Sequence, residues 1–189
     1  MTTVKELFQQ VGITRCDTVK WDETCPETRA GLYIVSLCAD PAATTGLKQP
    51  VFDDGLIQAW IDRLPDFRLD GARPTLDTLK KRLSEFWLPY ENVLYIGQTG
   101  SALDKRIRAY YRTPLGDRKP HSGGQWLKTL KNLSQLYVHY AVSDSPEADE
   151  SKLLAYFKQQ AGQLPFANLT GPDGRKQHGM VKQREEREK

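Results

Sequence analysis

The chain has 189 residues, of which 39% are hydrophobic and 27% charged, so we expect one folded domain rather than a disordered chain. The net charge of +3 identifies no partner. The sequence contains neither an apolar run of roughly 18 residues nor a secretory signal, which predicts a soluble, cytoplasmic protein that does not bind membranes. Three cysteines without a CxxC pair argue against a disulfide framework or a zinc site, and we expect reduced thiols.

Residues 1–30 are predicted to form a short helix and a polar lead-in. Thr3 and Glu6 have the spacing of a capping box, which predicts a helix through about Val11. Residues 31–37 are continuously apolar around Tyr33, a pattern typical of a strand that is buried on both faces. The first strand of the fold is therefore expected here.

Residues 39–92 are interrupted repeatedly by proline and glycine, which indicates a change of organisation. Between the interruptions, residues 54–64 and 75–88 place apolar side chains at helical spacing. We interpret this region as a helical insertion between two strands.

The second strand is predicted at residues 93–97, followed by a turn. Ser101 or Thr99 is expected to cap the next helix, residues 102–112. A loop at residues 114–124 and a short helix at 125–130 lead to a third strand at 136–142, where apolar residues alternate.

The last predicted helix begins at Ser145-Pro146-Glu147, which combines a cap residue, a proline at the first helical position and an acid in the first turn. Gly162 is expected to end it. Residues 171–189 are polar and are predicted to form a tail. The order of these elements predicts an α+β fold.

Two charged residues lie on apolar helix faces. Arg106 follows Leu103 by three residues, and Glu150 precedes Leu153 by three. Burying a charge costs several kcal/mol unless the charge is paired or binds an ion. Either Arg106 and Glu150 form a salt bridge that holds two helices together, or they belong to a functional site.

Five elements together support the second interpretation: Gly31-Leu32-Tyr33, Tyr95-Ile96-Gly97, Arg106, Glu150 and Pro165-x-x-Asn168. In this order they resemble the motifs of the GIY-YIG nuclease superfamily, over residues 31–37 and 93–170. The resemblance implies a small, mostly antiparallel three-stranded sheet flanked by helices, within a nuclease domain at residues 31–170. The chain departs from the family in Leu32, which replaces isoleucine, and in the insertion at 39–92.

The resemblance also implies roles in phosphodiester hydrolysis. Glu150 would hold one Mg²⁺ or Mn²⁺ ion, since a carboxylate is a hard oxygen ligand. Arg106 would clamp the scissile phosphate through its planar guanidinium, which lysine would not reproduce. Tyr33 is the expected general base. Because a tyrosine with its ordinary pKa near 10 is only about one-thousandth phenolate at pH 7, Tyr33 needs a nearby cation or a proton acceptor.

Further residues complete the predicted site. Tyr95 would orient the attacking water or bond the phosphate, and Asn168 would fix either the scaffold or the phosphate. Tyr110 lies one helical turn after Arg106 and is a second-line candidate. His121 lies in a loop from which it could reach a phosphate or leaving group, although a surface histidine is the commoner case. Each tyrosine alone could equally be a core aromatic residue with a satisfied hydroxyl.

Residues 95–140 contain eight basic residues and two acidic ones, which favours binding of nucleic acid or, alternatively, a solvated helix face. We expect a DNA endonuclease of a restriction or mobile-element type, with the insertion helping to hold the DNA. One site cuts one strand, so double-strand cleavage would need a homodimer or a second binding event. The alternatives are a non-catalytic nucleic-acid-binding protein and a structural or interaction protein. The expected phosphate contacts are Arg108, Arg112, Arg118, Lys119 and Lys128.

Overall fold

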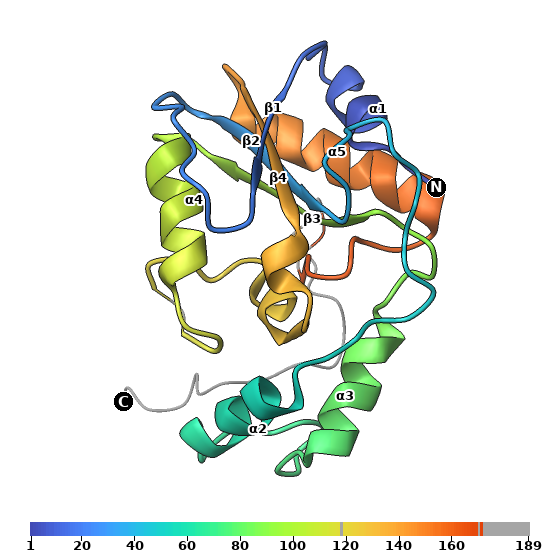
Figure 1. Ribbon diagram of the computed structural model, residues 1–189, viewed down its shortest axis with the longest axis vertical. Helices are drawn as coiled ribbons and strands as arrows, with labels where there is room; N and C mark the ends of the chain where they lie inside the picture. The colour runs from blue at the N-terminus through green and yellow to red at the C-terminus, as the bar shows by residue number, and fades with distance from the viewer. Residues whose placement is uncertain (118, 170, 172–189) are drawn as a thin grey trace.

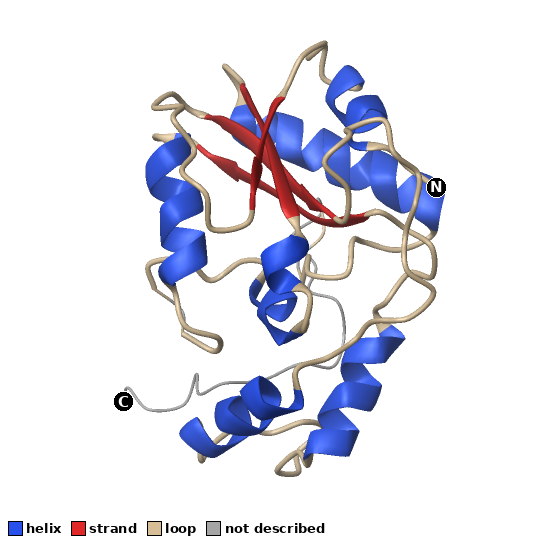
Figure 2. Cartoon of the chain, viewed as in Figure 1, coloured by secondary structure: helices blue, strands red, loops and turns tan. Residues whose placement is uncertain are grey.

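The computed structural model describes residues 1–117, 119–169 and 171, which form an α+β fold around one antiparallel sheet (Figures 1 and 2). The sheet has four strands in the order β1-β4-β2-β3, so β1 and β3 are its edges. The strands are β1 (Asp17–Lys20), β2 (Gly31–Ser36), β3 (Val93–Thr99) and β4 (Tyr137–Val142).

The fourth strand corrects the prediction of a three-stranded sheet. β1 pairs with β4 alone, from Asp17 opposite Tyr140 to Lys20 opposite Tyr137. Its ends are exposed and its sequence, Asp-Thr-Val-Lys, has one aliphatic residue, so no apolar alternation marks it. Tertiary pairing with β4 therefore decides its conformation.

Helices cover both faces of the sheet (Figure 1). On one face, α1 (Val4–Gln9) and α5 (Pro146–Ala161) pack Phe8, Leu153 and Phe157 against inward residues of β2 and β3. On the other face lie α4 (Leu103–Arg112) and the 3₁₀ helices η1 (Gln125–Thr129) and η2 (Leu133–Gln135). Because side chains alternate along a strand, β2 sends Tyr33 to the α4 face and Ile34 to the α5 face.

The insertion consists of α2 (Asp54–Arg63) and α3 (Leu76–Glu85), which lie together at the end of the molecule far from α1 (Figure 1). Two helices between β2 and β3 were predicted from the sequence. Helix α3 is shorter than predicted, because Phe86 is its C-cap. Asp53 and Thr75 cap the two helices through their side chains.

The start of α4 differs from its prediction. Ala102 is the N-cap, and the hydroxyl of Thr99 binds Ser101 instead of the helix. The first free amides of the helix, on Leu103 and Asp104, donate to backbone carbonyls of Arg29 and Glu27. The lead-in before β2 therefore caps α4.

Ser145 occupies the N-cap position of α5 with Pro146 at its start, as predicted, but the Ser145 side chain makes no capping hydrogen bond. Thr3 and Glu6 form the capping box of α1, and Gly162, in the left-handed region at φ 83°, ends α5. The three cysteines are free thiols. In the part of the chain that the structure describes, no helix is both long and apolar enough to cross a bilayer. Apart from residue 171, the predicted tail lies outside the described residues.

Candidate active site

Tyr33 lies at the centre of a cluster of polar aromatic side chains between the sheet and α4. Its side chain is fully buried, and its hydroxyl is hydrogen-bonded to Nε2 of His121 at 2.8 Å. Burial raises the pKa of Tyr33, and the Arg106 guanidinium opposes that shift. Tyr33 is therefore a neutral phenol whose hydroxyl is bonded to a base.

Tyr95 and Tyr110 pack around Tyr33. Their ring centroids lie 5.9 Å and 6.3 Å from that of Tyr33, and 5.4 Å from each other. Burial raises the pKa of both hydroxyls well above the ordinary value. The Tyr110 hydroxyl donates to the carbonyl of Gly124 at 2.6 Å, which fixes the end of the loop.

His121 is buried in this cluster, so the alternative of a surface histidine is wrong. Its ring stacks on that of Tyr110 with centroids 4.3 Å apart and planes 10° apart. Its backbone amide donates to Oγ1 of Thr113 at 3.2 Å, and its carbonyl accepts from Nε2 of Gln125 at 2.7 Å. The hydrogen bonds to the backbone amide and carbonyl of His121 thus fix the backbone that carries the imidazole.

The surroundings assign the proton between Tyr33 and His121. Arginine can only donate, and the Arg106 guanidinium lowers the pKa of Tyr33, so this side of the phenol oxygen favours a phenolic hydrogen that points to Nε2 of His121. Burial, together with the positive charges of Arg106 and Lys128, lowers the pKa of His121 to about 3. His121 is consequently a neutral imidazole that accepts from Tyr33.

Arg106 comes from α4 and is half-buried. Its Nε is buried and finds no hydrogen-bond partner in the described part of the chain. Across the described ranges, no ion pair within salt-bridge distance joins Arg106 to Glu150. The alternative of a simple Arg106–Glu150 salt bridge is therefore wrong.

Glu150 comes from α5, on the opposite face of the sheet. Its charge nevertheless acts on the pKa of both Tyr33 and Tyr95, since α5 packs against the edge strand β3. The pKa of Glu150 is raised to about 7, mainly because the carboxyl is buried. Within that value, the Arg106 charge lowers the pKa and the Glu147 carboxylate raises it. Half of the Glu150 side chains are therefore protonated near neutral pH.

Glu150 suits the single-carboxylate metal site that the sequence predicts. A half-buried carboxylate with a raised pKa gains from a cation, which offsets the cost of ionisation. Mg²⁺ keeps several waters and binds through one or two carboxylates together with phosphate. Among the described residues, no group of three or more histidine, cysteine, aspartate or glutamate side chains could form a closed protein cage.

Gly97 faces Tyr33 across the β2–β3 pair. A Cβ at this position would lie 2.6 Å from Cζ and 2.7 Å from the hydroxyl of Tyr33. Glycine is therefore required beside the phenol, which explains the glycine of the second motif in terms of space.

Asn168 is buried against β3 and uses both parts of its amide. Oδ1 accepts from the Ile96 amide at 2.9 Å, and Nδ2 donates to the Ile96 carbonyl at 2.8 Å. Of the two predicted roles, this geometry favours the scaffold, because Asn168 fixes the edge strand between Tyr95 and Gly97.

Lys128 contradicts its assignment as a phosphate contact. It is 7% exposed, and its ammonium donates to the carbonyls of Tyr110 at 2.6 Å, Tyr111 at 3.3 Å and Thr113. Burial lowers its pKa to about 8. Lys128 therefore caps the C-terminal end of α4, where a cation is favourable.

The other predicted phosphate contacts lie at the surface or outside the description. Arg108, Arg112 and Lys119 are exposed, whereas Arg118 lies outside the described residues. Arg108 and Arg112 border a small cavity of about 90 Å³ together with three acids, Asp22, Glu23 and Asp104. These carboxylates weaken the positive potential of this helix face.

No protein-family model, no curated protein and no solved structure matches this chain.

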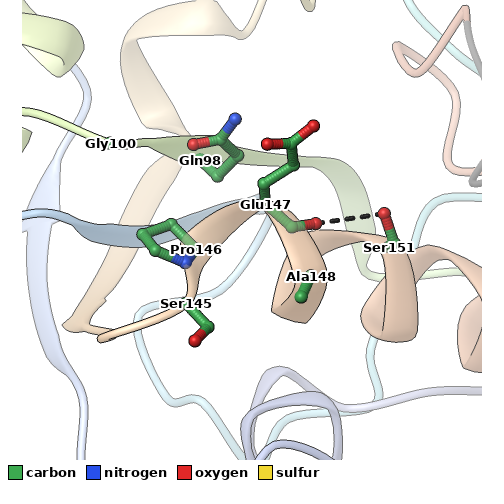
Figure 3. A pocket seen from close by; sticks show the side chains of 7 residues that line it. All are labelled: Gln98, Gly100, Ser145, Pro146, Glu147, Ala148 and Ser151. Carbon is green, nitrogen blue, oxygen red and sulfur yellow. Dashed lines mark hydrogen bonds between the residues drawn. The ribbon is translucent and has the colours of Figure 1, made fainter.

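An open depression of about 600 Å³ lies at the N-terminal end of α5, and Glu150 is not among the residues that line it. Figure 3 shows Gln98 of β3 and Glu147 of α5 on its wall, with the Ser151 hydroxyl bonded to the carbonyl of Glu147 at 3.0 Å.

Two residues that support the cluster, Thr113 and Gln125, were not predicted. Both act on the backbone of His121 through side-chain hydrogen bonds. Their separations from His121, eight residues before and four after, would suit a helix or a strand, but Pro120, Gly123 and Gly124 mark this segment as a loop. Sequence pattern carries no signal for such a loop contact.

Proposed function

We propose that this protein is a divalent-metal-dependent DNA endonuclease of the GIY-YIG type. The proposal is supported by the electrostatic coupling of Tyr33, Arg106 and Glu150, which come from a strand and from helices on both faces of the sheet. The charges of Arg106 and Glu150 act on each other and on Tyr33 without an ion pair between them, an arrangement that suits a phosphate and a cation.

The residues supply three parts of a hydrolytic mechanism. Arg106 binds the scissile phosphate with its guanidinium and neutralises charge that develops on it. Tyr33 takes a proton from the attacking water while its own proton passes to Nε2 of His121. Bound phosphate offsets the charge of Arg106, so the pKa of His121 rises when substrate is present.

A metal ion on Glu150 would add Lewis-acid stabilisation of the phosphate and of the leaving oxygen. Glu150 holds the cation and must be deprotonated to do so. Asn168 and Gly97 keep the edge strand in place and leave space beside Tyr33. Arg108, Arg112 and Lys119 are the exposed basic residues that would contact neighbouring phosphates.

Cleavage of defined DNA substrates tests the proposal. Purified protein is incubated with supercoiled plasmid and with branched DNA, with and without Mg²⁺, beside Glu150→Ala. Metal-dependent cleavage by the wild type that is lost in the variant supports the proposal. Binding without cleavage would instead favour a non-catalytic nucleic-acid-binding protein, and absence of both would favour an interaction protein.

A further inference from the structure

The insertion contacts the segment that carries His121 at both ends. At the first end, α2 packs the indole of Trp60 against Gly116, where a Cβ would lie 2.5 Å from Nε1. The Arg63 guanidinium donates to the carbonyl of Leu115 and lies 3.4 Å from the carboxylate of Asp117. These contacts hold the turn 115–117, which lies four to six residues before His121.

At the second end, the chain that enters α2 runs beside the residues after η1. The Asp53 amide donates to the carbonyl of Thr129, and the Lys131 amide donates to the carbonyl of Val51, both at 2.8 Å. Phe52 and Leu130 form an antiparallel bridge between these two bonds. The insertion therefore contacts residues 115–117 and 129–131. These ranges lie before and after His121 and Gln125, whose side chain bonds the His121 carbonyl.

The charge of the insertion does not favour the expected role in holding DNA. Residues 39–92 contain nine acidic and seven basic residues. A surface that binds phosphates needs an excess of cations. The insertion is better suited to packing, and Trp60 is 8% exposed and stacked on Phe67 with ring centroids 4.8 Å apart.

We infer that the α2–α3 insertion positions His121 against Tyr33, with Trp60 and Arg63 as positioning residues that act through the turn 115–117. The catalytic consequence rests on the proposed function, but the placement of His121 does not. Groups that face His121 are Tyr33 from β2, Arg106 and Tyr110 from α4, and Lys128 from η1. Release of the turn would admit water to this neutral imidazole.

The test compares the full-length wild type with Arg63→Ala, Trp60→Phe and Arg63→Lys by NMR titration of the His121 ring. Wild-type His121 should stay neutral down to about pH 4, because burial holds its pKa near 3. In Arg63→Ala and Trp60→Phe, we expect its pKa to rise toward the ordinary value near 6.5, with partial recovery in Arg63→Lys. Gln58→Ala, an exposed change on the same helix, should behave as the wild type.

Cleavage gives a second readout. If the proposed function holds, kcat should fall on the order of tenfold to a hundredfold in Arg63→Ala with little change in KM, since a misplaced proton acceptor affects the chemical step. An unchanged His121 titration in both Arg63→Ala and Trp60→Phe would overturn the inference. Failure of the wild type to cleave DNA would overturn the proposed function alone, because the titration needs no substrate.

Discussion

The Tyr33 hydroxyl is hydrogen-bonded to Nε2 of His121 at 2.8 Å, which joins a strand to a loop 88 residues further along the chain. This bond supplies what a tyrosine general base lacks at neutral pH, an acceptor for its own proton. The phenol is not activated by a lowered pKa, because burial outweighs the nearby arginine. Activation by proton relay is therefore the chemistry that this geometry supports.

The pair should behave as a unit in cleavage. Tyr33→Phe and His121→Asn are each expected to lower kcat by about 10²- to 10⁴-fold, since each removes one step of the relay. The double variant should be no slower than the slower single variant. Single-turnover rates at fixed Mg²⁺ measure this, and fully multiplicative losses would contradict a shared relay.

Glu150→Gln should stabilise the protein above pH 7. The folded pKa of Glu150, about 7, lies above its unfolded value, so its favourable contribution exists below about pH 4.5 and is lost as pH rises through 7. At pH 8 without metal, we expect a gain of about 1–3 kcal/mol in the free energy of unfolding, discounted for partial exposure. Urea unfolding measures it, with Asp66→Asn, an exposed acid in the insertion, as the control.

Gly97→Ala should disrupt the site through a steric clash. The added methyl would approach the Tyr33 ring and hydroxyl to less than 3 Å. We expect a loss of about 1–3 kcal/mol in stability together with loss of cleavage. Gly100→Ala is the matched control, because no atom lies within 4 Å of its Cβ position. Equal activity of the two variants would show that Tyr33 need not keep this position.

Acid should destabilise the fold through His139 as well as His121. His139 is fully buried, and its ring nitrogens bond Oγ1 of Thr18 and Oγ of Ser36 at 2.8 Å each. Burial lowers its pKa to about 4, while the Cys38 carbonyl and Asp40 oppose the shift. The unfolded state binds more protons in this range, so stability is lost as pH falls from about 6.5 to 4, by about 3 kcal/mol for this residue.

Urea unfolding of wild type and His139→Gln at pH 7.5 and pH 4.5 isolates this effect. The variant should lose less stability between the two pH values than the wild type. The opposite contribution of Glu150 is the same in both proteins and cancels in the comparison. Identical losses would indicate that His139 does not titrate between the folded and unfolded states.

Helical spacing was sufficient to predict that Arg106 and Glu150 turn toward the interior, because the rows of residues three and four apart define a helix face. It could not predict that Glu150 acts across an edge strand, which depends on the strand order. Strand β1 was not predicted because it, too, depends on the strand order: its polar sequence forms a strand through pairing with β4.

The loop contacts were less predictable still. His121 and Lys128 both carry polar groups and lie in a basic segment, which favours a surface position. Each is instead buried because a specific partner satisfies it: the Tyr33 hydroxyl for His121, and three carbonyls at the end of α4 for Lys128. Such partners are distant in sequence and follow no period.

The most direct test of the central claim is the rate at which Glu150→Gln nicks supercoiled plasmid at pH 8 with Mg²⁺, relative to the wild type. We expect metal-dependent nicking by the wild type and none by the variant, although the variant is at least as stable. Nicking by Glu150→Gln at the wild-type rate would contradict the assignment of this cluster as the catalytic site.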